Sequence, residues 1–190
     1  MSERTPWFSI ANLDSGDEEA VRQVAELLVE GFRGDWPEAW PDMDAALKEV
    51  RETFGEDRIS RVALGENGAV LGSIGGIPSY GDNVWELHPL VVRPDLQRRG
   101  IGRALVADLE ERVRERGGLT LWLGTDDETG MTTLSGVDLY PNVLEQLANI
   151  ENLRGHPCTF YQRLGFSIIG AMPDANGPGK PDIYMAKRCR

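Results

Sequence analysis

The feature that most constrains the fold of this chain is a strand, a glycine-containing turn and a helix in direct succession. Residues 85–92, with the sequence WELHPLVV, are rich in apolar side chains and predict a strand. Residues 101–116 predict a helix, along which apolar side chains recur at a spacing of four: Ile101, Leu105, Leu109 and Val113. Residues 97–102, QRRGIG, join the two. A chain that makes this transition favours a fold of the α/β class.

The turn between this strand and helix has the chemistry of a phosphate site. At the start of a helix the first backbone N–H groups have no partner within it, and the helix dipole adds partial positive charge. Gly100 and Gly102 lack a Cβ, so the backbone can approach phosphate oxygens closely. Arg98, Arg99 and Arg103 add positive charge in a chain whose net charge is −11. These features predict a pyrophosphate site; the simpler alternative is a plain strand-to-helix connection.

Two other phosphate-binding patterns are absent from this turn. No Lys-Ser or Lys-Thr pair follows the glycines, as in a P-loop, and no third Gly or Ala completes a dinucleotide fingerprint. The remaining pattern, Gln-x-x-Gly-x-Gly after a strand, resembles the acyl-CoA motif of the GNAT acetyltransferase superfamily. The resemblance implies that acetyl-CoA is the acetyl donor. It assigns these residues to that ligand: Leu90, Val91 and Val92 on the strand, and Gln97, Arg98, Arg99, Gly100, Ile101, Gly102 and Arg103 in the turn.

Composition indicates the cellular compartment of the protein and the kind of partner that it binds. The 31 acidic residues outnumber the 20 basic ones, which disfavours nucleic acid and favours a cationic partner, although acidity can also serve solubility alone. No apolar run approaches the ~20 residues of a membrane helix, and the first residues lack a signal segment. Cys158 and Cys189 have no ligand spacing, so we expect no metal site and free thiols. We therefore expect a cytoplasmic protein without a membrane partner.

The rest of the chain predicts strands and helices that belong to one domain, residues 1–190. Strands are expected over residues 7–10, 58–64, 69–77, 119–123, 167–171 and 183–186. Helices are expected after residues 14–17, from Met43 to Phe54, and over residues 138–150 and 159–164. Gly75 and Gly76, inside a strand, indicate a bulge or a close approach of another backbone. The order of elements predicts a mixed, mostly antiparallel central sheet flanked by helices, which is the GNAT acyl-CoA N-acyltransferase fold that the resemblance implies.

The resemblance is closer than the superfamily and extends to the aminoglycoside 6'-N-acetyltransferases. It runs nearly without gaps from about Gly72 to the C-terminus, and it is loose upstream apart from Trp36-Pro37-Glu38. The segments that carry it are WELHPLVV at 85–92, LGTDD at 123–127, TLS at 133–135, DLY at 138–140, NLRGHP at 152–157, FYQRLGF at 160–166, PDANG at 173–177 and KPDIYM at 180–185. Two departures are a longer segment at 32–42, which should border the substrate site, and Cys158 in place of an aromatic residue, which bears on packing.

Acetyl transfer to an amine needs a way to remove the amine proton, an oxyanion donor and a proton for the leaving thiolate. Glu86 is the candidate base, and strand alternation is expected to put His88 and Leu90 on the same side as Glu86. By resemblance, the Leu90 N–H stabilises the oxyanion, and Tyr161 contacts the coenzyme sulfur and protonates it. The alternatives are interface polar residues for Glu86 and His88, and a packed ring for Tyr161 whose hydroxyl finds a backbone acceptor.

Acidic and aromatic residues are the candidates for holding a cationic acceptor. Asp126 and Asp127 follow a strand end, where α/β folds place ligand sites. The resemblance adds Trp36, Glu38 and Tyr80 as a stacking and acidic wall, with Glu86 facing the amine. A loop of solvated acids is the alternative for the two aspartates. His156 is expected to be structural.

These observations predict an acetyl-CoA-dependent N-acetyltransferase that acts by direct transfer in a ternary complex. By resemblance the acceptor is the 6'-amine of an aminoglycoside and the enzyme is a homodimer. Two alternatives stay open: a GNAT enzyme for another amine, such as a polyamine, a peptide N-terminus or a lysine, and a non-catalytic acetyl-CoA-binding module.

Overall fold

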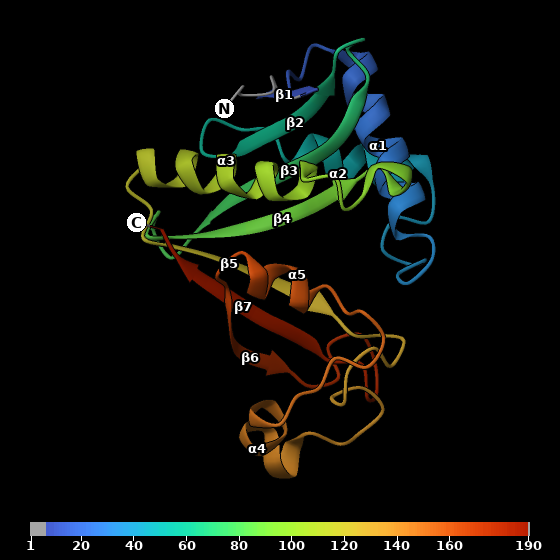
Figure 1. Cartoon of the computed structure of the whole chain (residues 1–190), viewed down its shortest axis with the longest axis vertical. Coiled ribbons are helices and arrows are strands. Elements are labelled where there is room, and N and C mark those ends of the chain that lie inside the picture. Colours follow the sequence, from blue (N-terminus) through green and yellow to red (C-terminus); the bar gives the residue numbers. More distant parts are fainter. Residues whose placement is uncertain (1–6, 190) are drawn as a thin grey trace, which may run out of the picture. The chain divides into compact units, whose positions relative to one another are not determined.

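The computed structural model describes residues 7–189, and the chain divides into two compact units (Figure 1). The described part of the first unit comprises residues 7–119 and Cys189. The second unit is Thr120–Arg188. Each unit contains both strands and helices.

The first unit is built on an antiparallel sheet of four strands. In spatial order these are β1 (Phe8–Asn12), β2 (Ile59–Gly65), β3 (Val70–Ser79) and β4 (Val84–Val92). The turn between β2 and β3 is the predicted Asn-Gly hairpin: Gly68 has φ 78°, and the Gly65 N–H donates to the Ala69 carbonyl.

Helices cover both faces of this sheet. Helices α1 (Glu18–Phe32) and α2 (Met43–Glu52) are capped by the side chains of Asp17 and Asp42 and share an apolar cluster with Val62, Val70 and Val91 of the sheet. Helix α3 (Ile101–Glu115) follows a 3₁₀ turn, η1 (Pro94–Leu96), and packs against β2 and β3.

Glycines in β3 let the helices approach the sheet. A Cβ on Gly76 would lie 2.6 Å from Leu109 of α3, so only glycine fits there. A Cβ on Gly75, the next residue, would point to the other face and lie 3.4 Å from Thr53, just after α2. Helix α3 therefore covers one face of the sheet, and α1 and α2 cover the other.

Strand β4 contains a bulge that changes which side chains share a face. Gly76 pairs with Leu87 and Ile74 with Leu90, so His88 and Pro89 together lie opposite Gly75. A Cβ on Gly75 would be 2.2 Å from the His88 carbonyl oxygen, which confirms the close approach that the Gly-Gly pair predicts. The peptide bond between His88 and Pro89 is cis.

The extra residue of the bulge shifts the alternation along β4 by one position. Leu87 and Leu90 oppose Gly76 and Ile74, and all four lie on the α3 face. Glu86 opposes Ile77 on the α2 face. The expectation that Leu90 shares a side with Glu86 and His88 is therefore wrong, because it assumed a regular strand.

The second unit has an antiparallel sheet of β5 (Thr120–Asp126), β7 (Asp182–Arg188) and β6 (Ser167–Met172), with β7 in the middle. Helix α5 (Cys158–Arg163) packs against β6 and β7, and α4 (Val143–Ala148) packs against β6. Between β5 and α4 the chain forms turns and a 3₁₀ turn, η2 (Tyr140–Asn142).

Most predicted elements are present with ends that differ by a few residues, but the helix predicted over 138–150 is wrong for half its length. Pro141 lies inside the predicted span, and the chain makes η2 there before the six-residue helix α4 begins at Val143. No residue of α4 is buried. Over residues 7–189, no helix is long and apolar enough to cross a membrane.

Candidate active site

The turn before α3 presents backbone N–H groups without a local cap. Arg98 and Gly100 both have positive φ, 62° and 94°, and Gly100 is the N-cap residue of α3 in the left-handed conformation. No side chain caps this end, and the first helical hydrogen bond runs from the Ala104 N–H to the Gly100 carbonyl. The N–H groups of the first turn are thus available to an anion.

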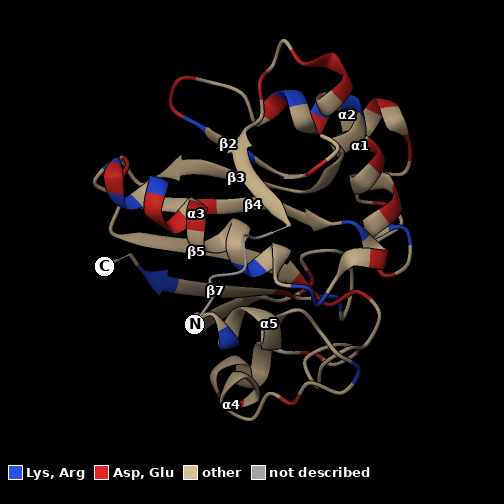
Figure 2. Ribbon diagram, turned by 45° about the horizontal axis from the view of Figure 1, so that its top comes forward, with Lys and Arg blue, Asp and Glu red and all other residues tan. Residues whose placement is uncertain are grey.

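The basic side chains of this turn differ in whether they form an ion pair within the protein. Arg93 makes a bidentate ion pair with Asp95, at 2.7 Å for both bonds, which raises the pKa of Arg93 and lowers that of Asp95. Arg98, Arg99 and Arg103 are exposed and form no ion pair with any residue of the described chain. Along α1 and α2, by contrast, Asp and Glu predominate (Figure 2). The turn therefore fits the pyrophosphate of a coenzyme.

On the α2 face of the sheet, His88 pairs with a carboxylate that the sequence did not single out. His88 Nε2 lies 3.4 Å from Oε1 of Glu49, and the other oxygen of Glu49 accepts a hydrogen bond from Trp40 Nε1 at 3.4 Å. The contact with His88 is the main cause that lowers the pKa of Glu49. Glu86 lies half-exposed on the same face, two residues along the strand.

Sequence reasoning missed Glu49 because α2 carries acidic residues at several positions, and only helix packing decides which one faces β4. The helical spacing gave a weak signal: Glu49 lies next to Val50, which is in the buried stripe.

The segment at 32–42 folds into an aromatic cluster. The ring of Phe32 contacts those of Trp40 and Trp36, with centroids 4.5 and 5.8 Å apart. Trp36 is half-buried, whereas Glu38 is exposed. Tyr80 lies in the β3–β4 connection with 84% of its surface exposed. Three residues of this unit were predicted to contact the acceptor. Packing fixes the ring of Trp36, whereas Glu38 and Tyr80 are exposed to solvent.

Tyr161 lies on α5 of the second unit and is buried at 8% exposure. Its ring makes edge contacts with Phe160 and Phe166, with centroids 5.0 and 5.6 Å apart. Burial raises the pKa of the phenol far above its usual value, so the hydroxyl keeps its proton at neutral pH. The side chain can therefore donate a hydrogen bond.

Asp126 and Asp127 differ although they are neighbours. Asp127 is fully buried, and its two carboxylate oxygens accept hydrogen bonds from the N–H groups of Met131 and Thr132, at 2.7 and 2.6 Å. It holds the loop after β5, so the expectation that it contacts the acceptor is wrong. Asp126 is half-exposed and accepts a hydrogen bond from the side-chain amide of Asn176.

His156 is structural, as expected. It is 1% exposed, its Nδ1 accepts from the Cys158 N–H at 3.2 Å, and its Nε2 lies 3.1 Å from the Asp126 carbonyl oxygen. Burial lowers the pKa of the imidazole. Cys158 and Cys189 are buried and form no disulfide bond, and residues 7–189 contain no group of His, Cys, Asp and Glu arranged to hold a metal ion.

Comparison with known proteins shows which protein family has this fold and this turn. The model of the acetyltransferase (GNAT) family matches residues 21–133. The chain therefore belongs to this family, and the predicted α/β GNAT fold is confirmed.

Three solved structures show which enzymes of this family the chain is similar to. An aminoglycoside 6'-N-acetyltransferase complexed with coenzyme A shares 42% identity over 96% of this chain and 97% of that chain, with a TM-score of 0.87. An aminoglycoside 6'-N-acetyltransferase from Enterococcus faecium shares 43% over the same fractions, with a TM-score of 0.84. An aminoglycoside 6'-acetyltransferase type Ii shares 35%, with a TM-score of 0.71. A comparison with curated protein sequences returns no match.

Proposed function

We propose that this protein transfers the acetyl group of acetyl-CoA to the 6'-amine of an aminoglycoside. The observation that carries the proposal is the turn before α3, with uncapped N–H groups and three unpaired arginines, in a chain 42% identical to an aminoglycoside 6'-N-acetyltransferase that binds coenzyme A. An aminoglycoside is a polycation, and a chain of net charge −11 attracts it.

In the proposed reaction the amine nitrogen attacks the thioester carbonyl carbon directly, a C–N bond forms, and the C–S bond breaks. Glu86 accepts the proton of the ammonium form of the acceptor, directly or through water, because a primary amine is mostly protonated at neutral pH. His88 assists on the same face of β4. The main-chain N–H of Leu90 stabilises the oxyanion; this role is independent of the face that the Leu90 side chain occupies, because main-chain groups lie in the plane of the sheet.

The buried phenol of Tyr161 supports a hydrogen bond to the departing sulfur rather than transfer of the phenol proton. A thiol has a pKa of about 8.5, well below that of a desolvated phenol. Full proton transfer from Tyr161 to the thiolate is therefore uphill. We assign Tyr161 as a hydrogen-bond donor that stabilises the departing sulfur, which takes its proton in the end from water or from the acceptor.

For the acceptor we retain Trp36, Glu38, Tyr80, Glu86 and Asp126 as contacts. Exposure and charge support Glu38 and Asp126 as anchors for ammonium groups, and the open ring of Tyr80 supports stacking. Main-chain groups of Val91 and Val92 and the side chain of Gln97 remain proposed contacts of the coenzyme, with Arg98, Arg99, Gly100, Ile101, Gly102 and Arg103.

The decisive experiment incubates the purified protein with acetyl-CoA and either neomycin or paromomycin, which differ in a 6'-amine and a 6'-hydroxyl. We expect thiol release with neomycin and at least about a hundredfold slower release with paromomycin, because an amine is the far better nucleophile toward a thioester. No thiol release with neomycin at high enzyme concentration would overturn the proposal. Equal release with both would move the acceptor to another amine, for which spermidine and peptide substrates are the comparison.

A non-catalytic coenzyme-binding module makes the opposite prediction for active-site variants. We expect Glu86→Gln to lower kcat/KM by roughly 10²–10⁴-fold without weakening coenzyme A binding. A protein that binds coenzyme A, acetylates none of these amines and is unaffected by Glu86→Gln would fit the module.

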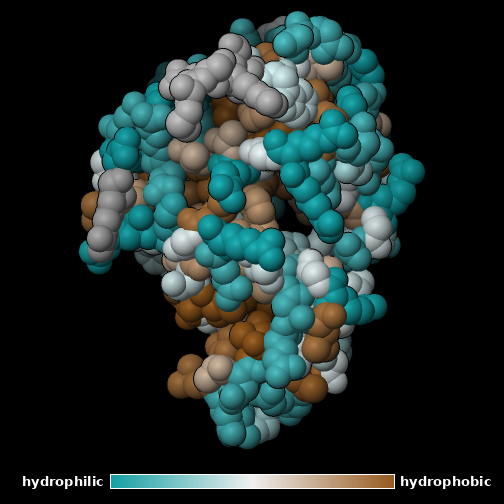
Figure 3. Space-filling view, in the orientation of Figure 1, coloured by the Kyte–Doolittle hydropathy of each residue, from teal (hydrophilic) through white to brown (hydrophobic). Residues whose placement is uncertain are grey.

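We further propose one GNAT domain in a cytoplasmic homodimer. The family match crosses from the first unit into the second, which supports a single domain. Two cysteines that form no disulfide bond, together with an intracellular acetyl donor, support a cytoplasmic location. Large side chains with apolar surface are exposed on the second unit and support self-association: Tyr140, Leu144, Leu153, Ile169 and Met172. Figure 3 shows hydrophobic residues, in brown, at the surface in the lower part of the view, where Figure 1 labels α4, β6 and β7. Sedimentation of the wild type and of Leu144→Lys tests it, with a shift to monomer expected for the variant.

A further inference from the structure

Glu49 of α2 meets strand β4 at the side chain of His88. Oε1 of Glu49 lies 3.4 Å from Nε2 of His88, and Oε2 of Glu49 accepts a hydrogen bond from Trp40 Nε1 at 3.4 Å. Each carboxylate oxygen therefore contacts a different side chain. The rings of Trp40 and His88 also lie close together, with centroids 6.1 Å apart. Residues from three segments of the first unit thus hold one imidazole in place.

The two members of the Glu49–His88 pair differ in exposure. The side chain of His88 is 43% exposed, whereas that of Glu49 is 20% exposed. A ligand on this face of the sheet reaches the imidazole more readily than the carboxylate. Glu49 is therefore placed to affect a reaction through His88 rather than by binding the acceptor itself.

The surroundings of Glu49 favour its ionised form. The hydrogen bond with His88 is the largest cause that lowers the pKa of Glu49, and Trp40 and the charge of Arg58 act in the same direction, while burial opposes them. The lowered pKa means that Glu49 is a carboxylate at neutral pH.

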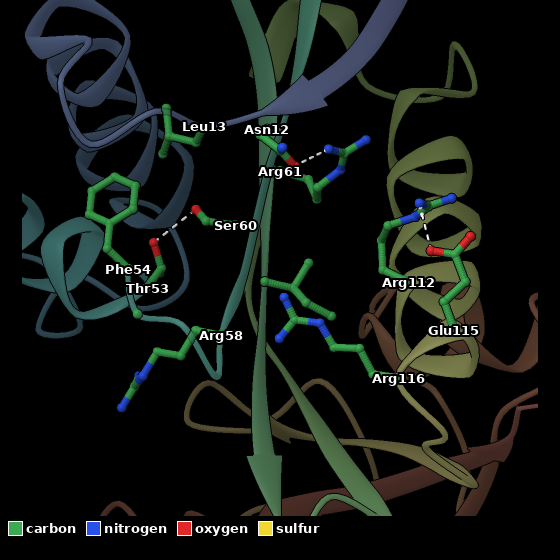
Figure 4. Close-up of a pocket in the computed structure, with 12 residues that line it drawn as sticks. Asn12, Leu13, Thr53, Phe54, Arg58, Ser60, Arg61, Arg112, Glu115 and Arg116 are labelled. Atoms are coloured by element: carbon green, nitrogen blue, oxygen red, sulfur yellow. Dashed lines mark hydrogen bonds and ion pairs between the residues drawn. The ribbon is translucent and has the colours of Figure 1, made fainter.

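The charge of Arg58 belongs to the α2 side of the unit. Arg58 directly precedes β2 and donates a hydrogen bond to the Glu52 carbonyl of α2 at 2.6 Å. Its side chain extends away from Arg116, which follows α3 (Figure 4). Arg58 therefore helps to keep Glu49 ionised, although the contact with His88 is the stronger influence.

A carboxylate in contact with an imidazole has two effects on it. Because a carboxylate only accepts hydrogen bonds, the contact keeps a proton on Nε2 of His88 and orients the ring. The negative charge also favours the imidazolium over the neutral ring. Glu49 therefore makes His88 a better proton acceptor than the same imidazole would be without the carboxylate.

Acetylation of an ammonium group needs more than one proton acceptor. The nitrogen begins with three protons and keeps one in the amide product, so two protons leave it. Glu86 can hold only one of them at a time. His88 lies two residues along β4 and is the other titratable group that the proposed reaction has on this face.

We propose that Glu49 is a positioning residue for the acetyl transfer: it fixes the imidazole of His88 and strengthens it as the acceptor of the second proton that leaves the amine nitrogen. Glu86 takes the proton that frees the amine for attack. After the C–N bond has formed, His88 takes a proton from the nitrogen, directly or through water, and the C–S bond breaks. One of the two protons ends in solvent and the other on the departing sulfur. The inference rests on the proposed function, because it assigns a role within that reaction.

The first measurement needs no substrate, because it follows the imidazole by NMR as the pH is changed. The chain contains two histidines, and His156 is 1% exposed, so a spectrum of His88→Gln identifies the signals of His88. We expect the midpoint of the His88 titration to fall by about half a pH unit or more in Glu49→Gln, because the favoured imidazolium loses its carboxylate.

Two further variants separate the charge of Glu49 from its shape. Glu49→Asp keeps the charge on a shorter side chain, and its midpoint should lie between those of the wild type and Glu49→Gln. The matched control is Glu52→Gln, which removes an exposed acid of the same helix and should leave the His88 midpoint unchanged. Far-UV circular dichroism shows whether each variant is folded.

The second measurement is a double-mutant cycle in the acetylation of neomycin. Glu49→Gln should lower kcat about tenfold and leave the KM for acetyl-CoA unchanged, since positioning supplies only part of the 10²–10⁴-fold that a proton acceptor contributes. In a His88→Gln background, the same change should lower kcat by less than about twofold, because the route through His88 is already lost.

Two outcomes overturn the proposal. An unchanged His88 midpoint in Glu49→Gln would show that the carboxylate does not act on the imidazole. Losses of kcat that multiply in the double variant would show that Glu49 acts by a route other than His88. A protein that acetylates no amine but shows the shifted midpoint would refute the proposed function, and with it the role of Glu49 in acetylation, while the coupling of Glu49 to His88 stands. The two failures are therefore distinguishable.

Discussion

Two charged segments of this chain, the turn before α3 and the loop after β5, have opposite uses for their charges. In the turn, Arg98 and Arg99 are exposed and unpaired within the described chain, so their charge faces solvent and any ligand there. In the loop, Asp127 is fully buried and both of its oxygens bind backbone N–H groups. The sequence predicts a ligand site at both segments, but only the turn before α3 presents its charge to a partner.

The difference teaches how to interpret a charged pair of residues next to a strand end. A carboxylate can satisfy the N–H groups of its own loop, since it accepts several hydrogen bonds, and it then becomes part of the fold. A guanidinium only donates, and α3 offers further donors at its N-terminus rather than acceptors. Arginines at a helix start therefore stay free for an anion, whereas an aspartate after a strand is easily used internally.

The largest effect that follows is on stability. Asp127→Ala removes both acceptors of the Met131 and Thr132 N–H groups, and we expect unfolding to become easier by about 3–5 kcal/mol, because bonds to charged groups contribute about 1.5–3 kcal/mol each. Denaturant unfolding measures it. The control is Asp126→Ala, half-exposed, for which we expect less than about 1 kcal/mol. Equal losses at the two positions would break the comparison.

The next effect is on donor binding. In Arg98→Gln with Arg99→Gln the protein should fold normally, and the KM for acetyl-CoA should rise roughly 10–100-fold with a smaller change in kcat, because charged hydrogen bonds to phosphate are lost. Steady-state kinetics at low and high salt measure this, and the difference should shrink at high salt. Arg93→Gln serves as the control, since Asp95 already uses that charge. A KM that rises as much in Arg93→Gln as in the double variant would contradict the assignment.

A smaller effect concerns the backbone of the turn. Gly100 has φ 94°, and a Cβ there would meet no atom within 4 Å, so Gly100→Ala introduces conformational strain without a clash. We expect a loss of about 1–2 kcal/mol together with weaker donor binding. Gly81→Ala, at φ 63° with equally open surroundings, should lose similar stability and bind the donor normally. Donor binding that stays intact in Gly100→Ala would argue that the turn geometry is not needed.

The smallest effect is a pH dependence at Glu49. Its pKa is lowered in the folded protein, chiefly by the hydrogen bond with His88, so its ionised form stabilises the fold. That contribution is present above the unfolded pKa of about 4.5 and is lost as the pH falls through the lower folded value. Glu49→Gln should lower stability at pH 6 by about 0.5–1 kcal/mol, and the gap should narrow below pH 4. Glu52→Gln, an exposed acid on the same helix, is the control. A gap that is constant with pH would exclude an ionic origin.

Strand β4 illustrates how far a sequence pattern reaches. The apolar run at 85–92 and the Gly-Gly pair in the neighbouring strand predict a strand and an irregularity, and both are present. The pattern did not tell on which strand the extra residue lies. Because the bulge falls at His88-Pro89 on β4, Leu90 moves to the face opposite Glu86. A one-residue shift inverts every later side chain, so alternation cannot be carried across an unplaced bulge.

Local patterns determined much of this protein on their own. The turn at 97–102, its glycine in the left-handed conformation, the helix behind it and the hairpin at Asn67-Gly68 all follow from interactions between residues close in sequence, which act wherever those residues occur. The GNAT class followed from the same turn, because a phosphate site at a helix start is a local structure.

Only the tertiary structure decided the rest. It paired His88 with Glu49 across 39 positions of sequence, and it buried Asp127 while leaving Asp126 half-exposed. The physical reason is common to both. Burial and pairing depend on which elements pack together, and a side chain's charge is visible to a ligand only where no neighbour distant in sequence has already satisfied it.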